Sequence, residues 1–178
     1  MQERELLITY KEFLKKYNKV LNLTSKNVNL DEIINQSIYI EKFIKENSKI
    51  MDVGSGGGIV GIPLKIIRND SVVYLIERSQ KKSTFLQIVI KKLNLSGIFV
   101  ISEDYKNLKL NEKFDVIIAR ALGNYKFLVK TLKKFLKEDG KFIIFSDFEY
   151  EGFNVIKEKI GNLTISILTP LKFLLWSK

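Results

Sequence analysis

The sequence contains no cysteine and no histidine among its 178 residues. Without cysteine the chain can form no disulfide and offers no thiol nucleophile, so pyrimidine C5 methylation and related chemistry are excluded. Without histidine it lacks the usual proton shuttle and the commonest metal ligand. We therefore expect no metal site, and no titration of activity near the ordinary histidine pKa of about 6.5.

Long apolar runs are also missing. No stretch approaches the roughly 20 apolar residues that a membrane-spanning helix needs, and residues 1–5 have neither the basic nor the apolar region of a signal peptide. The chain is 46% apolar, which is typical of a soluble globular protein with a full core. We expect one domain over residues 1–178, monomeric and located in the cytoplasm, with no membrane partner.

Basic residues are in clear excess: 30 lysines and arginines face 20 acids, for a net charge of +10. An excess of this size is typical of proteins that bind a polyanion such as nucleic acid. A lysine-rich composition produced by A/T-rich codons would give the same excess without any binding. The four arginines, which such a bias does not favour, are Arg4, Arg68, Arg78 and Arg120.

The glycine-rich segment 49–64 organises the rest of the chain. An apolar run ends at Asp52, several glycines follow, and apolar residues then recur at helical spacing with Pro63 in the first turn, which predicts strand, turn and helix. A carboxylate at Asp52 would repel a pyrophosphate but suits an ammonium or a sulfonium. The segment therefore predicts a site for S-adenosylmethionine, with contacts from Asp52, Gly54, Ser55, Gly56 and Gly58.

Strands and helices alternate beyond this turn, which predicts a parallel sheet. Glu77 ends a predicted strand at 71–76 and lies 23 residues after Gly54, where an acid can accept the hydroxyls of a ribose. Glu103 and Asp104 follow a predicted strand at 98–101 and are candidates for the adenine amino group. Further predicted elements are strands at 113–118 and 141–145, a helix over 124–137, and a turn at 138–140.

The two ends of the chain differ from this alternating core. Apolar residues at helical spacing predict one amphipathic helix over 6–21 and a second over 31–45, which together form a helical cap over 1–46 on a Rossmann-like core over 47–178. At the other end, apolar runs at 163–168 and 171–176 flank Thr169 and Pro170. This pattern predicts a terminal antiparallel hairpin on the parallel sheet.

Four motifs in order carry a specific resemblance that covers roughly residues 10–145. They are Asn22-Leu23-Thr24, Asp52 to Gly56 running into Gly61 to Leu64, Lys81-Lys82 with Phe85-Leu86, and Phe114-Asp115-Val116 with Ala119-Arg120-Ala121. In combination they resemble the bacterial 16S ribosomal RNA guanine-N7 methyltransferases, also called the glucose-inhibited division protein B family. The resemblance implies a class I S-adenosylmethionine-dependent methyltransferase fold and methylation of one guanine in the 530 loop of 16S RNA of the small ribosomal subunit.

The sequence departs from the family pattern at three places. Asn35-Gln36-Ser37-Ile38-Tyr39 stand where relatives usually carry a histidine and an aspartate in the second helix, Glu103 stands where an arginine is common, and Ser146-Asp147 replace a lysine and a glycine. Cofactor contacts carry over more directly than RNA contacts. With the family as guide we assign RNA binding to Asn22, Thr24, Arg78, Lys81, Lys82, Arg120 and Lys126.

The residues themselves restrict the reaction. Exocyclic amines of bases are typically methylated at an Asn/Asp-Pro-Pro-aromatic turn, and the segment 119–122 cannot form one. Guanine N7 has a free lone pair, so its methylation needs no general base. Arg120 is our catalytic and cofactor-side candidate, acting on a phosphate or on guanine O6, because a bidentate arginine on O6 and N7 would block the reacting atom. The alternative is an internal ion pair with a carboxylate such as Asp115. A small-molecule methyltransferase and a non-catalytic RNA-binding module stay open.

Overall fold

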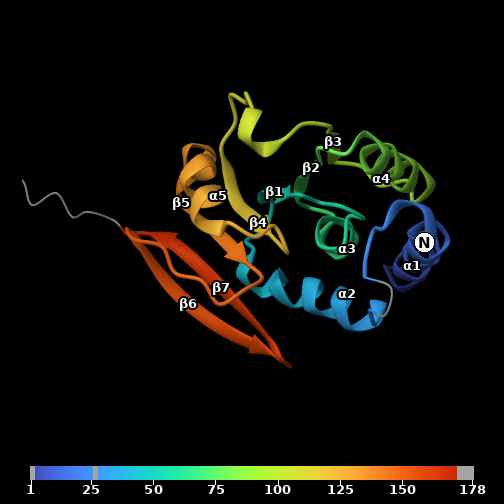
Figure 1. Ribbon diagram of the computed structural model, residues 1–178, viewed down its shortest axis with the longest axis horizontal. Helices are drawn as coiled ribbons and strands as arrows, with labels where there is room; N and C mark the ends of the chain where they lie inside the picture. Colours follow the sequence, from blue (N-terminus) through green and yellow to red (C-terminus); the bar gives the residue numbers. More distant parts are fainter. Residues whose placement is uncertain (1–2, 26–27, 172–178) are drawn as a thin grey trace, which may run out of the picture.

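The computed structural model describes residues 3–25 and 28–171, and a seven-stranded sheet lies at their centre (Figure 1). The sheet order is β3-β2-β1-β4-β5-β7-β6. Strands β1 to β5 are parallel, whereas β7 is antiparallel to both β5 and β6. This confirms the predicted sheet. The strands are β1 Lys49–Val53, β2 Val72–Ile76, β3 Ile98–Ile101, β4 Phe114–Ala119, β5 Leu136–Ile144, β6 Phe153–Ile160 and β7 Leu163–Pro170.

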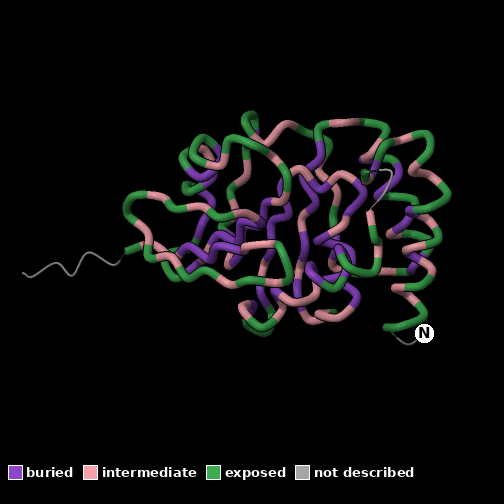
Figure 2. The backbone as a smooth tube through the Cα atoms, turned by 60° about the horizontal axis from the view of Figure 1, so that its bottom comes forward, coloured by how far each residue is buried: buried purple, intermediate pink, exposed green. Residues whose placement is uncertain are grey.

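Helices cover both faces of the sheet. One face carries α1 Glu3–Leu21, α2 Leu30–Tyr39, α3 Gly61–Ile67 and α4 Gln80–Lys92, and the other carries α5 Tyr125–Leu132. Because strand side chains alternate, Ile50 packs toward α1–α4 while Met51 packs toward α5. The buried strands between the exposed outer turns are visible in Figure 2. Short 3₁₀ helices are η1 Ile40–Phe43, η2 Tyr105–Asn107 and η3 Lys133–Phe135.

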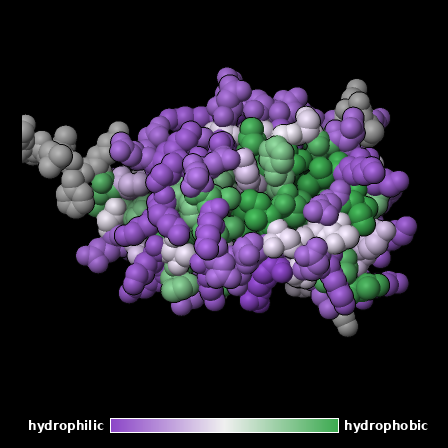
Figure 3. Space-filling model, turned by 90° about the horizontal axis from the view of Figure 1, so that it is seen from above, coloured by the Kyte–Doolittle hydropathy of each residue, from purple (hydrophilic) through white to green (hydrophobic). Residues whose placement is uncertain are grey.

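The outer surface is mostly hydrophilic, with an apolar area visible on the face in Figure 3. The N-terminal helices are not a loose addition to this body. Tyr10 and Leu14 of α1 are at most 1% exposed and belong to the same core as the α3 and α4 side of the sheet. None of the helices within 3–25 and 28–171 is both long enough and apolar enough to cross a membrane.

The C-terminal hairpin lies elsewhere than predicted. Its turn falls at residues 161–162, between β6 and β7, and Thr169 and Pro170 end β7 instead of forming a turn. The prediction was wrong because β6 is a half-exposed edge strand, in which Phe153, Val155 and Ile160 are separated by polar and charged residues. Residues 172–176 of the predicted partner strand lie outside the described residues.

Two predicted helices are shorter in the structure. The helix expected over 31–45 ends at Tyr39 and continues as η1. The helix expected over 124–137 ends at Leu132 and continues as η3, after which β5 begins at Leu136. The β4–β5 register shifts between Phe114↔Leu136 and Val116↔Lys141, so the expected turn at 138–140 is an irregular stretch within β5. Burial of Phe135 and Leu136 overrides the helical pattern there.

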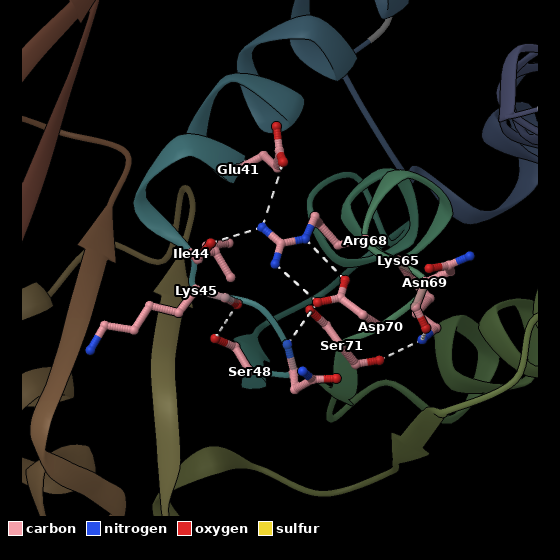
Figure 4. Close-up of polar contacts among 10 residues, drawn as sticks. Glu41, Ile44, Lys45, Ser48, Lys65, Arg68, Asn69, Asp70 and Ser71 are labelled. Carbon is pink, nitrogen blue, oxygen red and sulfur yellow. Dashed lines mark hydrogen bonds and ion pairs between the residues drawn. The ribbon is translucent and has the colours of Figure 1, made fainter.

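A polar cluster ties the loops at the amino ends of β1 and β2 (Figure 4). Arg68 donates from Nε and Nη2 to the two oxygens of Asp70, both at 3.0 Å, and from Nη1 to the carbonyl of Ile44 at 2.8 Å. Asp70 also accepts from the Asn47 N–H at 2.7 Å. The Arg68 guanidinium and this N–H hold the pKa of Asp70 well below its ordinary value. The cluster fixes the α2 side of the molecule to the α3–β2 connection.

Candidate functional site

A cavity of about 630 Å³ opens at the carboxyl ends of β1, β2 and β4. Open α/β sheets bind ligands at this edge, and the volume is within the usual range for ligand sites, about 300–1,000 Å³. Its walls come from the α1–α2 connection with Ile33, from residues 52–60, from the ends of β2 and β3, and from residues 120–122. The predicted cofactor residues that line it are Asp52, Gly54, Ser55, Gly56, Glu77, Glu103, Asp104 and Arg120.

The glycine turn is bound to the end of β2. The N–H groups of Gly54 and Ser55 donate to the carbonyl of Ile76 at 2.8 and 3.0 Å. Gly54 has φ +67, and a Cβ there would lie 2.3 Å from Leu122, so only glycine fits. Gly57 lines the cavity, whereas Gly58, which we predicted to do so, is not among its lining residues.

The turn is also held from behind by α1. The Tyr10 hydroxyl, which is fully buried, donates to the carbonyl of Gly57 at 2.8 Å. Burial, with a smaller contribution from the charge of Asp52, raises the pKa of Tyr10 well above its ordinary value. Tyr10 therefore stays a neutral donor, and the N-terminal helix positions the turn directly.

Asp52 is 2% exposed, and its Oδ2 accepts from the Gly61 N–H at 3.1 Å. Burial raises the pKa of Asp52 to about 7, although the Gly61 hydrogen bond favours the charged form. Asp52 is thus a group that can titrate close to the histidine range, while the expected absence of an activity titration near pH 6.5 stays a prediction. Residue type alone did not reveal this, because the pKa shift comes from the depth at which β1 places the side chain. A bound cation would stabilise the charged carboxylate.

Glu77 is 7% exposed and both of its oxygens accept backbone N–H groups. Oε2 accepts from Gly56 at 2.8 Å and Oε1 from Ser79 at 2.7 Å. A carboxylate has about four acceptor positions, so two remain for the hydroxyls of a ligand. Glu77 thus fixes the glycine turn to the start of α4 and still presents acceptors at the cavity wall.

Glu103 and Asp104 form part of the wall beyond β3. Asp104 accepts from the Lys106 N–H at 3.0 Å, which caps η2, and lies 3.8 Å from Nη1 of Arg78. Glu103 Oε1 accepts from the Asp104 N–H at 2.8 Å. Their carboxylates are thus held by local contacts beside the space that an adenine would occupy, and their predicted contact with its amino group stays a prediction.

Arg120 follows β4 and is held by α2. Its Nη2 donates to Gln36 Oε1 at 2.7 Å, and its Nη1 donates to the Ile33 carbonyl at 3.3 Å and to Ser37 Oγ at 3.4 Å. Its Cζ lies 5.0 Å from the centre of the Phe145 ring. All three acceptors are neutral, and burial lowers the pKa of Arg120.

The alternative for Arg120, an ion pair with Asp115, is wrong. Asp115 instead accepts from Lys137 Nζ and from the Lys49 N–H, both at 2.8 Å. Among the residues that the structure describes, Arg120 forms no ion pair. The next residue, Ala121, has φ +55, a conformation that costs energy for a residue with a Cβ, and such strain clusters at functional sites.

The predicted RNA residues divide into two groups. Thr24, Arg78, Lys82 and Arg120 line the cavity, whereas Asn22, Lys81 and Lys126 do not. Asn22 directly follows α1 with φ +49, and its carbonyl accepts from Lys82 Nζ at 3.2 Å. No group of three potential metal ligands occurs within the described ranges.

Sequence reasoning missed several residues of the site. Tyr105 and Lys106 line the cavity, and their position directly after Asp104 was a usable signal. Gln36 and Ser37 hold Arg120 from behind, at 7% and 0% exposure. Buried polar residues on a helix are a weak signal in one sequence, because only the fold shows which charge they face.

Both acidic and basic side chains line the cavity. The carboxylates of Asp52 and Glu77 lie at the glycine turn, whereas Arg78, Lys82 and Lys106 line the wall together with Glu103 and Asp104. This donor set fits a ligand that carries an ammonium or sulfonium and ribose hydroxyls. It does not fit a pyrophosphate on the glycine turn.

Solved structures with the same fold are methyltransferases. A ribosomal protein L11 methylase from Lactobacillus delbrueckii subsp. bulgaricus superposes with a TM-score of 0.64 at 20% identity, over 80% of each chain. Coclaurine N-methyltransferase bound to N-methylheliamine and SAH gives 0.61 at 18% identity, over 88% of this chain and 50% of that one. The fold is therefore that of the class I S-adenosylmethionine-dependent methyltransferases.

The family follows from sequence. The model of rRNA small subunit methyltransferase G matches residues 3–159. The ribosomal RNA small subunit methyltransferase G of Oenococcus oeni is 36% identical over 158 residues, which cover 83% of this chain. The chain belongs to the rRNA small subunit methyltransferase G family. It spans 65% of the length of that relative.

Proposed function

We propose that this protein uses S-adenosylmethionine to methylate N7 of a guanine in the 530 loop of 16S ribosomal RNA. The substrate is in the small ribosomal subunit, and the site of action is the cytoplasm. The observation that carries the proposal is one cavity in which two buried acids, Asp52 and Glu77, lie beside the glycine turn and Arg120, at the end of β4, has no ion pair within residues 3–25 and 28–171.

The cofactor assignment rests on charge. Asp52 is placed for the ammonium or sulfonium region, Glu77 for the ribose hydroxyls, and the Gly54–Gly57 backbone for close approach of the ligand. When bound, S-adenosylmethionine supplies an electrophilic methyl group on a sulfonium. The protein's part is to fix the ligand against a turn that is itself held by Tyr10, Glu77 and Ile76.

The proposed reaction requires little acid–base catalysis by the protein. The N7 lone pair of guanine is free, so no residue has to remove a proton before attack, and catalysis consists of orientation at near-attack distance and exclusion of water. The described residues of the site fit this demand, since Arg120 can grip a phosphate or O6 while N7 stays clear. The planar fork of arginine suits either contact.

The test is transfer of a labelled methyl group to 16S RNA, followed by mapping of 7-methylguanosine. Naked 16S RNA and isolated small subunits are supplied in parallel, because the state recognised sets the efficiency. Label at one guanine of the 530 loop supports the proposal, and RNA from cells with and without the gene provides the control. Transfer only to small molecules, or RNA binding without transfer, contradicts it and returns the protein to the small-molecule or the non-catalytic reading.

A further inference from the structure

Phe127 is a large aromatic side chain on the outside of α5. Its ring side is 43% exposed, whereas the next two residues, Leu128 and Val129, are fully buried. The Asn124 side chain accepts from the Phe127 N–H at 3.0 Å and so caps this first helical turn. The backbone is therefore fixed, while the ring is not part of the buried core.

Lysines lie over the ring and on its helix. Lys106 Nζ lies 5.8 Å from the ring centre, and Lys106 also lines the cavity, so this side chain connects the Phe127 ring with the cavity wall. Lys126 and Lys130 are exposed on the same helix. Within 3–25 and 28–171 none of these three lysines forms an ion pair. The acids of the same loop are engaged locally, Asp104 with Arg78 and Glu103 with the Asp104 N–H.

We infer that Phe127 is a stacking platform for an unpaired RNA base near the target guanine, with Lys106, Lys126 and Lys130 binding the adjoining phosphates. An exposed aromatic ring among cations is the arrangement that holds single-stranded nucleic acid, because every base offers a π-face and every linkage a charge. A protein partner fits less well, since lysine is depleted at the centre of protein interfaces. The inference rests on the proposed function, because it takes RNA as the substrate.

Phe99 provides a matched control. It is also an exposed phenylalanine, at 51%, but it lies on the edge strand β3 and packs at 5.4 Å against Tyr74. Neither phenylalanine is a lining residue of the cavity, but in the described part of the chain no lysine lies over the Phe99 ring, whereas Lys106, a lining residue, lies over Phe127. The same substitution at both positions therefore separates stacking at Phe127 from loss of a surface phenylalanine.

The experiment measures binding of a short RNA containing the 530 loop to Phe127→Leu, Phe127→Tyr and Phe99→Leu proteins by fluorescence anisotropy over a salt series. Phe127→Leu should weaken binding by about 5- to 100-fold, the loss expected for one stacked base. Phe127→Tyr, which keeps the ring, should bind like the wild type, and so should Phe99→Leu. The salt slope should not change in Phe127→Leu, because no charge is lost. S-adenosylmethionine affinity should stay the same in all variants.

Wild-type RNA affinity in Phe127→Leu overturns the inference, and so does an equal loss in Phe99→Leu. Failure of the proposed function is distinguishable from both. If the wild type transfers no methyl group to 16S RNA, the function is wrong whatever Phe127 does. If it transfers the group and Phe127→Leu binds normally, the inference alone is wrong.

Discussion

The two ends of the parallel sheet use charged residues in opposite ways. At the amino ends of β1 and β2, Arg68 has a carboxylate and a carbonyl within hydrogen-bond distance, and Glu41 lies 3.5 Å away. At the carboxyl ends, Arg120 donates to neutral oxygens and lies over an aromatic ring, and the carboxylate of Glu32 acts on it from beyond Gln36. The neighbouring charges raise the pKa of Arg68, whereas burial lowers that of Arg120. Arg68 has two carboxylates in direct contact, whereas Arg120 has none within ion-pair distance among the described residues.

This difference indicates which polar residues serve folding and which serve a ligand. A half-buried charge without a counter-charge is costly, and a protein retains it where a ligand supplies the missing partner. The same reasoning applies to Asp52, which is buried beside another acid and whose pKa is raised to about 7, while the pKa of Asp70 is depressed by Arg68. Substitutions at either end of the sheet therefore test this difference between the two arginines and between the two acids.

The largest effect, a loss of stability, is expected from a substitution at the amino ends of β1 and β2. Arg68→Ala leaves Asp70 without its ion pair and the Ile44 carbonyl without its donor, and it should cost about 2–4 kcal/mol of unfolding free energy. Thermal unfolding measures this loss, which corresponds to roughly 5–15 °C. Cofactor affinity of the folded protein should not change. Unchanged stability would mean that the cluster in Figure 4 contributes nothing net.

Acid dependence gives a second readout of the same cluster. The pKa of Asp70 is lower in the folded protein than its ordinary value of 3.8, so its contribution is present above that value and is lost as the pH falls below it. The difference in unfolding free energy between wild type and Arg68→Ala should therefore be smaller at pH 3 than at pH 7.

Much of the fold could be predicted from sequence. Strands β1 to β3 alternate with helices, and β3 leads through η2 to β4, a pattern typical of a parallel sheet; the predicted bounds of β2 to β4 differ by a residue or less from those observed. The hairpin could not be placed, because β6 has charged residues on its exposed side and reads as a loop. The end of α5 could not be placed either, because Phe135 and Leu136 continue its apolar spacing but are buried by β5 pairing.

The candidate site, too, has one part that could be predicted from sequence and one that could not. Asp52, Glu77 and the glycine turn are contiguous with strand ends, so their position followed from local pattern. The contacts of Arg120 with α2 join residues more than 80 positions apart, and no local pattern encodes them. The pKa of Asp52 was missed for a related reason, since burial is a property of the assembled core.

The next largest effect is expected at Glu77. Glu77→Ala removes charge-assisted hydrogen bonds to the ribose and should lower S-adenosylmethionine affinity about tenfold or more, as measured by calorimetry. Because Glu77 also binds the Gly56 and Ser79 N–H groups, the variant loosens the turn as well. A 2′-deoxy analogue of the demethylated cofactor separates the lost ribose contact from the loosened turn. It should bind the wild type more weakly than the unmodified product does, and Glu77→Ala should weaken its binding little further. If the loss of affinity from Glu77→Ala and the loss from the missing hydroxyl add in full, Glu77 does not bind the ribose.

Arg120→Ala should lower methylation of 16S RNA at least tenfold, as expected for a lost charged hydrogen bond of about 1.5–3 kcal/mol, while cofactor affinity stays within about twofold. Arg120→Lys should recover little, because lysine lacks the planar fork. Single-turnover rates at saturating cofactor measure the effect. The α2 contacts require a folding control, so thermal unfolding of both variants is compared with that of wild type. Wild-type rates in a folded Arg120→Ala protein would make the arginine a purely structural link to α2.

The smallest effect is a pH dependence that originates at Asp52. Its pKa of about 7 in the free protein means that the carboxylate is mostly protonated at pH 5.5 and about half ionised at pH 7. An α-amino group, with an ordinary pKa of about 7.7–8.0, stays largely protonated over this window. Cofactor affinity should therefore rise several-fold from pH 5.5 to 7, and Asp52→Asn should bind weakly with no such rise. A rise of equal size in Asp52→Asn would place the titrating group elsewhere.

Stability of the cofactor-free protein should move in the opposite direction. The folded pKa of Asp52 is raised above its ordinary value of 3.8, so between about pH 4 and 7 the folded state binds more protons than the unfolded state and is destabilised as the pH rises. Asp52→Asn lacks this buried charge and can keep an acceptor oxygen for the Gly61 N–H. It should therefore melt at a higher temperature than wild type at pH 7.5. This difference in melting temperature should decrease toward pH 5. A gain in stability coupled to a loss of cofactor affinity is the result expected of a residue that the ligand, and not the fold, requires to be charged.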